Sequence, residues 1–246
     1  MHFLVGAATD VGRKRAKNQD HFLAQPELGL FAVADGMGGH QGGEIASQKA
    51  LEALLESIRQ QLRSHPKIQA QELLYQALAS ANQHVYDLSQ KNPDLAGMGT
   101  TLTCLFFRDQ EVFIGQVGDS RCYLLKKEAI WQLTRDHSLV QEKVRAGLIT
   151  RDQVKTDSMR NVITRSIGYE PQVEIDIFSF QTQSDQAFLL CSDGLSGQVD
   201  DSTLLRIAQT QFFFGDDTEK TVQEYIQRAN LHGGDDNITC IIVKKV

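Results

Sequence analysis

Four aspartates stand at the ends of apolar segments, each beside a glycine, serine or asparagine: Asp35, Asp119, Asp193 and Asp236. One aspartate in such a place is a common turn residue. Four of them bordering buried segments indicate carboxylates gathered in one place, where they would repel one another unless cations lay between them. Oxygen ligands without a nearby histidine or thiolate partner select hard ions. The pattern therefore predicts a site for Mg²⁺ or Mn²⁺.

The segment around Asp35 has the sharpest pattern. Residues 30–34 form a continuous apolar run, which is typical of a strand buried on both faces. Five glycines follow within eight residues and let the backbone approach a ligand where side chains would collide. His40 lies inside this loop. Because a buried carboxylate is costly unless its charge meets a cation or hydrogen-bond donors, we interpret this segment as half of a metal site.

Three cations, Arg13, Arg15 and Lys17, alternate between the first two expected strands. In an extended chain their side chains would point the same way. An arginine can hold two phosphoryl oxygens in its fork, and a metal pair can convert water into hydroxide near neutral pH. The combination suits hydrolysis of a phosphate ester. A solvated turn is the alternative interpretation of the three cations.

Several other chemistries are disfavoured by missing motifs. The sequence has neither the D-x-D-x-D-G loop of an EF-hand nor the G-x-x-x-x-G-K-[ST] of a P-loop. Its four cysteines stand singly inside apolar runs without C-x-x-C spacing, so zinc and a disulfide framework are disfavoured and buried free thiols are expected. No cysteine nucleophile with a phosphate loop is present, which removes the cysteine-phosphatase route.

The overall composition is that of an ordinary globular protein. The chain has 246 residues, a hydrophobic fraction of 41% and a charged fraction of 23%, and no linker-like segment divides it, so we expect one domain, 1–246. A net charge of −6 without a basic stripe argues against nucleic acid or an anionic membrane as the main partner. No apolar run reaches the length of a membrane span, and no signal pattern opens the sequence, so a cytoplasmic location is expected.

The periodicity of apolar residues outlines the elements that must position the acids. Spacings of three and four predict two amphipathic helices, one from residue 44 to 64 and one closing near residue 92. Short β-branched or aromatic runs at 100–107, 111–117, 121–126 and 130–133 favour an antiparallel meander. The other expected strands are 3–8, 20–24, 30–34, 173–179, 187–191 and 238–243, and the other expected helices are 136–145, 201–212 and 218–230.

Six segments occur together in the order and spacing of the metal-dependent type-2C (PPM) serine/threonine protein phosphatases: TDVGRKRAKNQD, VADGMGGHQGGE, MGTT, GQVGDSR, LLCSDGL and GGDDNIT. Singly, strings such as DG and GDSR are weak signals, but six in register are highly specific. From Phe3 to Val246 the chain resembles the compact bacterial members of this family. The resemblance implies an α+β fold, a four-layer α/β/β/α sandwich with two central antiparallel sheets flanked by helix pairs.

The resemblance also implies the metal ligands. It places Asp35 as the carboxylate that bridges two ions and the Gly36 carbonyl as a further ligand of the second ion. Asp193 and Asp236 complete the ligand set of the first ion. Asp119, together with Asp193, resembles the ligands of a third and weaker ion. The implied cofactor is therefore Mn²⁺ or Mg²⁺, with two tightly bound ions and a third weaker one.

Three further residues receive roles from the same resemblance. Arg15, rather than Arg13, corresponds to the arginine that binds phosphate, and Asp20 corresponds to an acid that orients metal-bound water. His40 resembles the histidine proposed as general acid to the departing serine or threonine oxygen, with a backbone-bonded loop histidine as the alternative. Residues 147–164 resemble the flap thought to govern substrate access.

Two departures from the family pattern bear on the site. Gln19 stands where many relatives carry glutamate, so a water-mediated contact to the second ion would be weaker. Residues 157–159, Asp-Ser-Met, occupy a stretch of the flap where bacterial relatives often have His-Pro, which puts docking of the flap near the site in question.

We therefore predict a phosphoprotein phosphatase that hydrolyses phosphoserine and phosphothreonine by direct attack of a metal-activated water, without a phosphoenzyme. Its expected partners are phosphoproteins made by a serine/threonine kinase in bacterial signalling, and a monomer is expected. A two-metal phosphodiesterase is one alternative, against which the acidic balance and the lack of aromatic or basic tracts count. A catalytically weak regulatory module that binds phosphoproteins is the other, although every implied ligand is intact.

Overall fold

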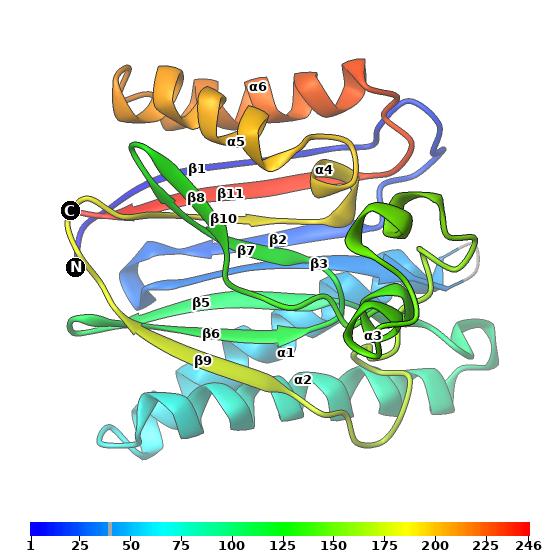
Figure 1. Ribbon diagram of the computed structural model, residues 1–246. Coiled ribbons are helices and arrows are strands. Elements are labelled where there is room, and N and C mark those ends of the chain that lie inside the picture. Colours follow the sequence, from blue (N-terminus) through cyan, green and yellow to red (C-terminus); the bar gives the residue numbers. More distant parts are fainter. Residues whose placement is uncertain (39–40) are drawn as a thin grey trace.

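The computed structural model describes residues 1–38 and 41–246, in which two antiparallel sheets pack face to face between two layers of helices (Figure 1). The five-stranded sheet, here sheet A, has the order β1-β11-β10-β7-β8. The six-stranded sheet, sheet B, has the order β2-β3-β5-β6-β9, with β4 paired to β3. The strands are β1 Phe3–Asp10, β2 Asp20–Gln25, β3 Leu30–Met37, β4 Gly99–Thr100, β5 Leu102–Arg108, β6 Glu111–Val117, β7 Arg121–Lys126, β8 Ala129–Gln132, β9 Asp176–Gln181, β10 Ala187–Cys191 and β11 Ile238–Lys245.

The helices form the outer layers, as Figure 1 shows, with α1 and α2 against sheet B and α5 and α6 against sheet A. The helices are α1 Gly42–Ser64, α2 Ala70–Lys91, α3 Leu139–Arg145, α4 Asp193–Ser196, α5 Asp201–Ile207 and α6 Thr218–Leu231. Short 3-10 turns are η1 Pro26–Leu28, η2 Pro93–Leu95 and η3 Arg151–Thr156, and η4 Ala208–Phe213 is a π-helix. The predicted four-layer sandwich is confirmed.

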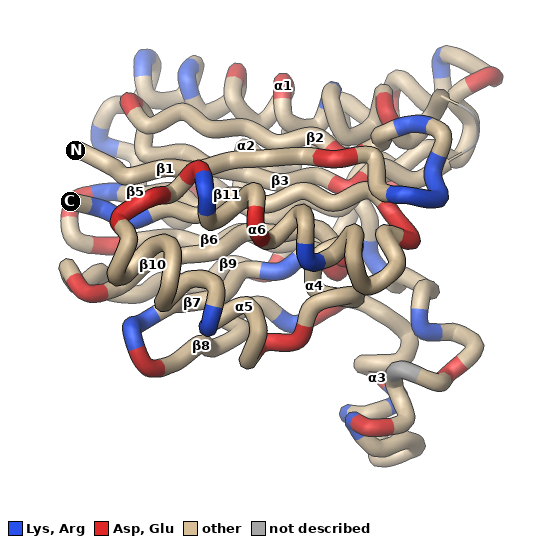
Figure 2. The backbone as a smooth tube through the Cα atoms, turned by 90° about the horizontal axis from the view of Figure 1, so that it is seen from above, with Lys and Arg blue, Asp and Glu red and all other residues tan. Residues whose placement is uncertain are grey.

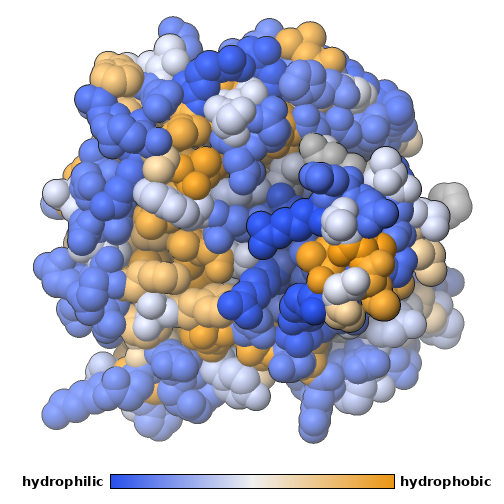
Figure 3. Space-filling view, viewed as in Figure 1, coloured by the Kyte–Doolittle hydropathy of each residue, from blue (hydrophilic) through white to orange (hydrophobic). Residues whose placement is uncertain are grey.

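Three apolar cores hold the four layers together, one between each neighbouring pair. The helix stripes predicted from the sequence supply the outer two, because a helix beside a sheet must bury one face. In the central core, Phe107 of sheet B packs edge to face against its neighbour Phe31 and against Phe188 of sheet A, and the centroids of Phe107 and Phe188 are 5.6 Å apart. Leu124 and Phe178 only partly close this core, and Figure 3 shows apolar surface between β8 and β9.

The predicted single meander is wrong in one respect, because its four strands belong to two sheets. β5 and β6 pair in sheet B, whereas β7 and β8 pair in sheet A. The chain crosses between the sheets at Gly118, Asp119 and Ser120. Local alternation cannot reveal this crossing, since both hairpins bury one face against the same central core. The crossing brings Asp119 to the edge where strands of both sheets end.

Three other boundaries differ from those expected. The helix expected at 136–145 begins at Leu139, because Ser138 is extended and the side chains of Asp136 and His137 bond to Arg121 and Gly118 instead. The strand expected at 173–179 is Asp176–Gln181, since its bounds follow pairing with β6. The helix expected at 201–212 ends at Ile207 and continues as the π-helix η4, and the irregular segment 147–160 contains η3.

The four cysteines are buried free thiols, as expected. Burial raises the pKa of Cys104 and of Cys191 to about 12, so neither thiol is available as a nucleophile near neutral pH. Among the helices that the structure describes, none combines the length and apolar character needed to cross a membrane.

We expect Leu54→Ala to lower the free energy of unfolding by about 2–5 kcal/mol, because Leu54 of α1 is fully buried against sheet B and its loss leaves a cavity. Leu148→Ala is the matched control, since Leu148 in the flap is 73% exposed. Urea unfolding in the presence of EDTA measures both variants. Equal losses in the two would contradict the assignment of Leu54 to the core.

Candidate metal centre

The predicted acids come from strand ends of both sheets. Asp35 lies on β3 and is the cross-strand partner of Asp20 on β2. Asp193 opens α4 directly after β10, and Asp236 precedes β11, the neighbour of β10. Asp119 stands at the crossing between sheets. The strands therefore bring together all five acids that the sequence singled out.

The five carboxylates act on one another electrostatically. Burial raises the pKa of Asp35 well above its usual value, and the negative charges of Asp20, Asp193, Asp119 and Asp236 raise it further. Burial and the charge of Asp193 raise the pKa of Asp119 to about 8. Burial is also the main cause that raises the pKa of Asp20 to about 7, against the opposing effect of its hydrogen bond from Ser192. A cluster of carboxyl groups with raised pKa values is typical of a site that binds cations.

Unpaired oxygens show that the cluster fits cations. In the described part of the chain, Oδ1 of Asp20, Asp119 and Asp193 is buried and accepts no hydrogen bond. A buried acceptor without a donor is costly and rare, and a hard cation satisfies it. Within residues 1–38 and 41–246, no group of three acidic, histidine or cysteine side chains is arranged so that it could hold a metal ion by itself. The unpaired carboxylate oxygens are nevertheless the kind of donor that Mg²⁺ and Mn²⁺ prefer.

Glycines let the backbone approach the centre closely. A Cβ on Gly36 would lie 2.0 Å from the carbonyl oxygen of Gly43, and a Cβ on Gly194 would lie 1.9 Å from that of Asn237. A side chain at Gly36 would push β3, which carries Asp35, away from the start of α1, and a side chain at Gly194 would push α4, which carries Asp193, away from the segment before β11. The glycine-rich pattern therefore reflects packing around the acids.

Arg15 reaches the centre. Its Nη2 donates to Oδ2 of Asp236 over 2.6 Å, and both side chains remain partly exposed. Arg13 instead bonds through its backbone N–H to the carbonyl oxygen of Gly234. Figure 2 shows the basic segment between β1 and β2 on the same side of the molecule as the acidic strand ends. Of the alternating cations, Arg15 is thus placed beside a site acid.

Two neutral residues that the sequence analysis did not single out brace the acids. Ser192 donates from Oγ to Oδ2 of Asp20 over 2.7 Å and accepts the backbone N–H of Thr239. Asn237 donates from Nδ2 to the carbonyl oxygens of Val11 and Lys17, at 2.9 Å each, which fixes both ends of the loop carrying Arg15. Their position beside Asp193 and Asp236 was the available signal.

The two departures from the family pattern have structural counterparts. The side chain of Gln19 donates from Nε2 to the carbonyl oxygen of Gly38 over 3.5 Å, so it contacts the glycine loop. Its main-chain carbonyl oxygen accepts the N–H of Gly36 and the hydroxyl of Ser47, as that of a glutamate could. Asp157 pairs with Lys143 over 2.9 Å, which ties the flap to α3. His40 lies outside the described residues, and its role stays a prediction.

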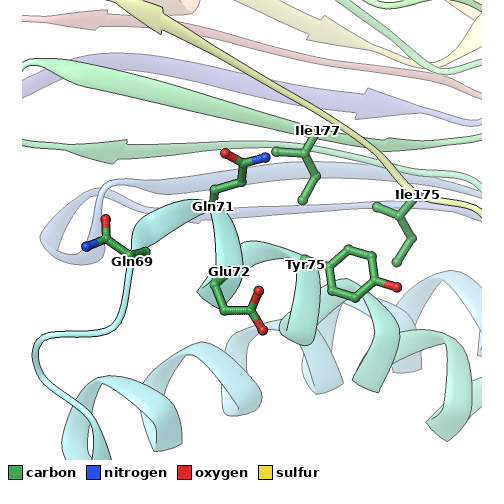
Figure 4. A pocket seen from close by; sticks show the side chains of 6 residues that line it. All are labelled: Gln69, Gln71, Glu72, Tyr75, Ile175 and Ile177. Carbon is green, nitrogen blue, oxygen red and sulfur yellow. The ribbon is translucent and has the colours of Figure 1, made fainter.

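A groove lies away from the acid cluster. This groove, of about 590 Å³, runs between the start of α2 and β9, and Figure 4 shows the side chains along it. Its lining residues are Gln69, Gln71, Glu72, Tyr75, Ile175 and Ile177. None of these is a predicted site residue, and the groove contains one carboxylate only. The acid cluster at the strand ends, rather than this groove, therefore has the side chains suited to metal binding.

Comparison with known proteins agrees with this geometry. The sequence matches the family described as Protein phosphatase 2C over residues 11–234. It is 34% identical over 240 residues to the serine/threonine phosphatase stp of Listeria monocytogenes serotype 4b, covering 96% of this chain and 94% of that one.

Solved structures extend the comparison to the fold. The Mycobacterium tuberculosis serine/threonine phosphatase PstP/Ppp superposes with a TM-score of 0.89 at 33% identity, covering 98% of each chain. A catalytic domain of PstP in complex with two manganese ions gives 0.86 at 33% identity, covering 98% of this chain and 97% of that one. The chain therefore belongs to the protein phosphatase 2C family. It is a metal-dependent protein serine/threonine phosphatase.

The raised acid pKa values predict how the stability of the metal-free protein varies with pH. A carboxyl whose folded pKa is about 7 binds a proton in the folded state while its unfolded form, with a pKa near 4, has lost it. Between these values, the contribution of Asp20 to stability falls as pH rises. In EDTA, we therefore expect Asp20→Asn to gain stability relative to wild type as pH rises from 5 to 8.

Urea midpoints at several pH values measure this difference. The comparison with wild type also removes the opposite trend from His137, whose pKa is lowered by burial. A difference that does not change with pH would contradict a buried, charge-repelled Asp20.

Proposed function

We propose that this chain hydrolyses phosphoserine and phosphothreonine monoesters in proteins with the centre formed by Asp35, Asp119, Asp193 and Asp236. The cluster of buried carboxylates with unpaired oxygens, bordered by Arg15, is the observation that carries the proposal. Substrates would come from serine/threonine kinases, because such a reaction must first form the monoester. The whole chain would act as one catalytic domain with a flap at 147–164.

Each acid has a distinct place in this proposal. Asp35 would bridge two ions, with the Gly36 carbonyl oxygen on the second ion and Asp193 and Asp236 on the first. Asp119 would hold a third ion together with Asp193. When bound, Mn²⁺ or Mg²⁺ would supply hydroxide near neutral pH by lowering the pKa of water and would neutralise the clustered acids.

The chain's own residues would orient the reactants. Arg15 can offer two N–H groups to two phosphoryl oxygens, and its present partner is Asp236. Asp20 keeps Oδ1 unpaired while Oδ2 accepts the hydroxyl of Ser192, so Oδ1 can accept a proton from water in the site.

Hydrolysis of three esters tests the function. A phosphothreonine peptide, p-nitrophenyl phosphate and a bis-ester would each be assayed with EDTA or with added Mn²⁺, beside Asp35→Asn. We expect Mn²⁺-dependent release of phosphate from the two monoesters only, and none from Asp35→Asn. Preference for the bis-ester would indicate a phosphodiesterase. Binding of the phosphopeptide without turnover would indicate a regulatory module.

Arg15 and Arg13 form a matched pair for a test of phosphate binding. We expect Arg15→Ala to raise KM for the phosphothreonine peptide about 10- to 100-fold, because hydrogen bonds to charged groups contribute about 1.5–3 kcal/mol. The effect on kcat should be smaller if the contact is the same in the ground and transition states. Arg13→Ala should leave KM near that of wild type. Similar KM values for both variants would refute the assignment of Arg15.

His40 carries a separate prediction, made from the sequence. Expulsion of a serine or threonine alkoxide needs a proton, whereas p-nitrophenolate leaves without one. His40→Gln should therefore slow hydrolysis of the phosphothreonine peptide by roughly 10²-fold and that of p-nitrophenyl phosphate far less. The ratio of the two kcat/KM values is the measurement. Equal losses on both substrates would leave His40 as a structural loop residue.

A further inference from the structure

His137 occupies a buried position between the acid cluster and the flap, with only 6% of its surface exposed. It bonds to the peptide groups on both sides of Gly118, the residue before Asp119. The backbone N–H of Gly118 donates to Nδ1 of His137 over 3.1 Å, and the backbone N–H of His137 donates to the carbonyl oxygen of Gly118, also over 3.1 Å. One residue thus fixes the backbone that aims Asp119.

The position of Gly118 favours glycine for two reasons. Its φ of +103° is unfavourable for other residues, and a Cβ there would lie 2.6 Å from Cγ2 of Thr101. The other side of Asp119 is held by Arg121, which donates from Nε and Nη2 to Asp136, the residue before His137. Asp136 and His137 therefore hold, through these hydrogen bonds, the residues on both sides of Asp119 where the chain crosses between the sheets.

The opposite side of His137 faces the base of the flap. Since Nδ1 accepts a hydrogen bond, the ring proton is on Nε2, which lies 3.4 Å from Oδ2 of Asp176 on β9. Arg165 donates from Nη1 to Oδ1 of Asp176 over 3.0 Å. The backbone N–H of Thr164, at the end of the flap, donates to the carbonyl oxygen of His137 over 2.8 Å. The flap leaves the fold through α3, which begins at Leu139, so both of its ends meet at this histidine.

We propose that His137 is a positioning residue that aligns Asp119 and couples it to the flap base, defined here as Thr164, Arg165 and Asp176. The inference rests on the proposed function, in which Asp119 holds the third ion. Groups that orient a metal ligand strongly affect affinity although they never touch the ion. By reciprocity, an ion on Asp119 must favour the docked flap base to the same extent that docking favours the ion.

Two substitutions separate the hydrogen bonds from the packing. His137→Phe keeps the bulk of the ring but leaves the Gly118 N–H without its acceptor. His137→Asn can place its Oδ1 near the position of Nδ1 and so keep that acceptor while losing the contact with Asp176. Asp157→Asn is the matched control in the flap, because it breaks the ion pair with Lys143 and leaves the bonds of His137 intact.

The first measurement is phosphatase activity against Mn²⁺ concentration. We expect His137→Phe to raise the Mn²⁺ concentration for half-maximal activity by about 10-fold or more, the usual effect of removing a group that supports a ligand. KM for the phosphothreonine peptide should stay near the wild-type value. His137→Asn should lie between wild type and His137→Phe, and Asp157→Asn should match wild type.

The second measurement needs no turnover. Trypsin can cut within the flap at Arg151 and Arg160 and just before it at Arg145, all of which are exposed. Millimolar Mn²⁺ should slow this cleavage in wild type and in Asp157→Asn, but not in His137→Phe or Asp119→Asn. Asp176→Ala, which removes the partner of Nε2 from the other side, should reduce the protection and provides the test if His137→Phe does not fold.

The outcomes separate the inference from the proposed function. Wild-type Mn²⁺ dependence and protection in His137→Phe would overturn the inference, as would His137→Asn being impaired as much as His137→Phe. If His137→Phe is unfolded, full protection in Asp176→Ala would overturn it instead. Wild-type turnover in Asp119→Asn would overturn the role of Asp119 itself. If Asp119→Asn is inactive while His137→Phe behaves as wild type, the inference about His137 is refuted and the proposed function is not.

Discussion

Repulsion among buried carboxylates is the interaction on which the rest of this structure depends. Asp35 carries the cost of burial and the added charge of its neighbours, and Asp20 and Asp119 have pKa values raised to about 7 and about 8. The fold holds these groups together against their mutual repulsion because three apolar cores stabilise the strands that carry them. Stability without metal is thus reduced at the place where the chemistry needs concentrated charge.

Neutral groups and glycines keep the acids in position without cancelling their charge. Ser192 and Asn237 donate to one acid and to the loop backbone, yet Oδ1 of Asp193 stays unpaired within the described chain. Arg15 offsets part of the negative charge of the acids, because it pairs with Asp236. If Arg15 binds phosphate as we propose, a phosphate group and Asp236 would compete for the same guanidinium, and phosphate binding would depend on whether an ion engages Asp236.

The location of the site explains why an enclosed cavity is not needed. A phosphorylated side chain of a protein must reach the centre from outside, so an open edge with strong charge suits it better than the groove between α2 and β9. In our proposal, the flap at 147–164 would govern access to this edge. The bonds from Gly118 through His137 to Thr164 and Asp176 place the base of the flap in contact with the acid cluster, so events at the flap have a direct structural route to Asp119.

From the sequence alone, periodicity predicted the amphipathic helices and aspartates at strand ends singled out the acids, because both are local patterns, whereas the resemblance to a known family implied the four-layer fold. The sequence also favoured Arg15 over Arg13 as the phosphate ligand; the structure places Arg15 beside Asp236, and its role stays a prediction. It could not show that the chain changes sheets at Asp119, because both hairpins have the same alternation. It also gave no sign that His137 would join Gly118 to the flap. Those contacts link residues far apart in the chain, and only the packing of the two sheets brings them within hydrogen-bond distance.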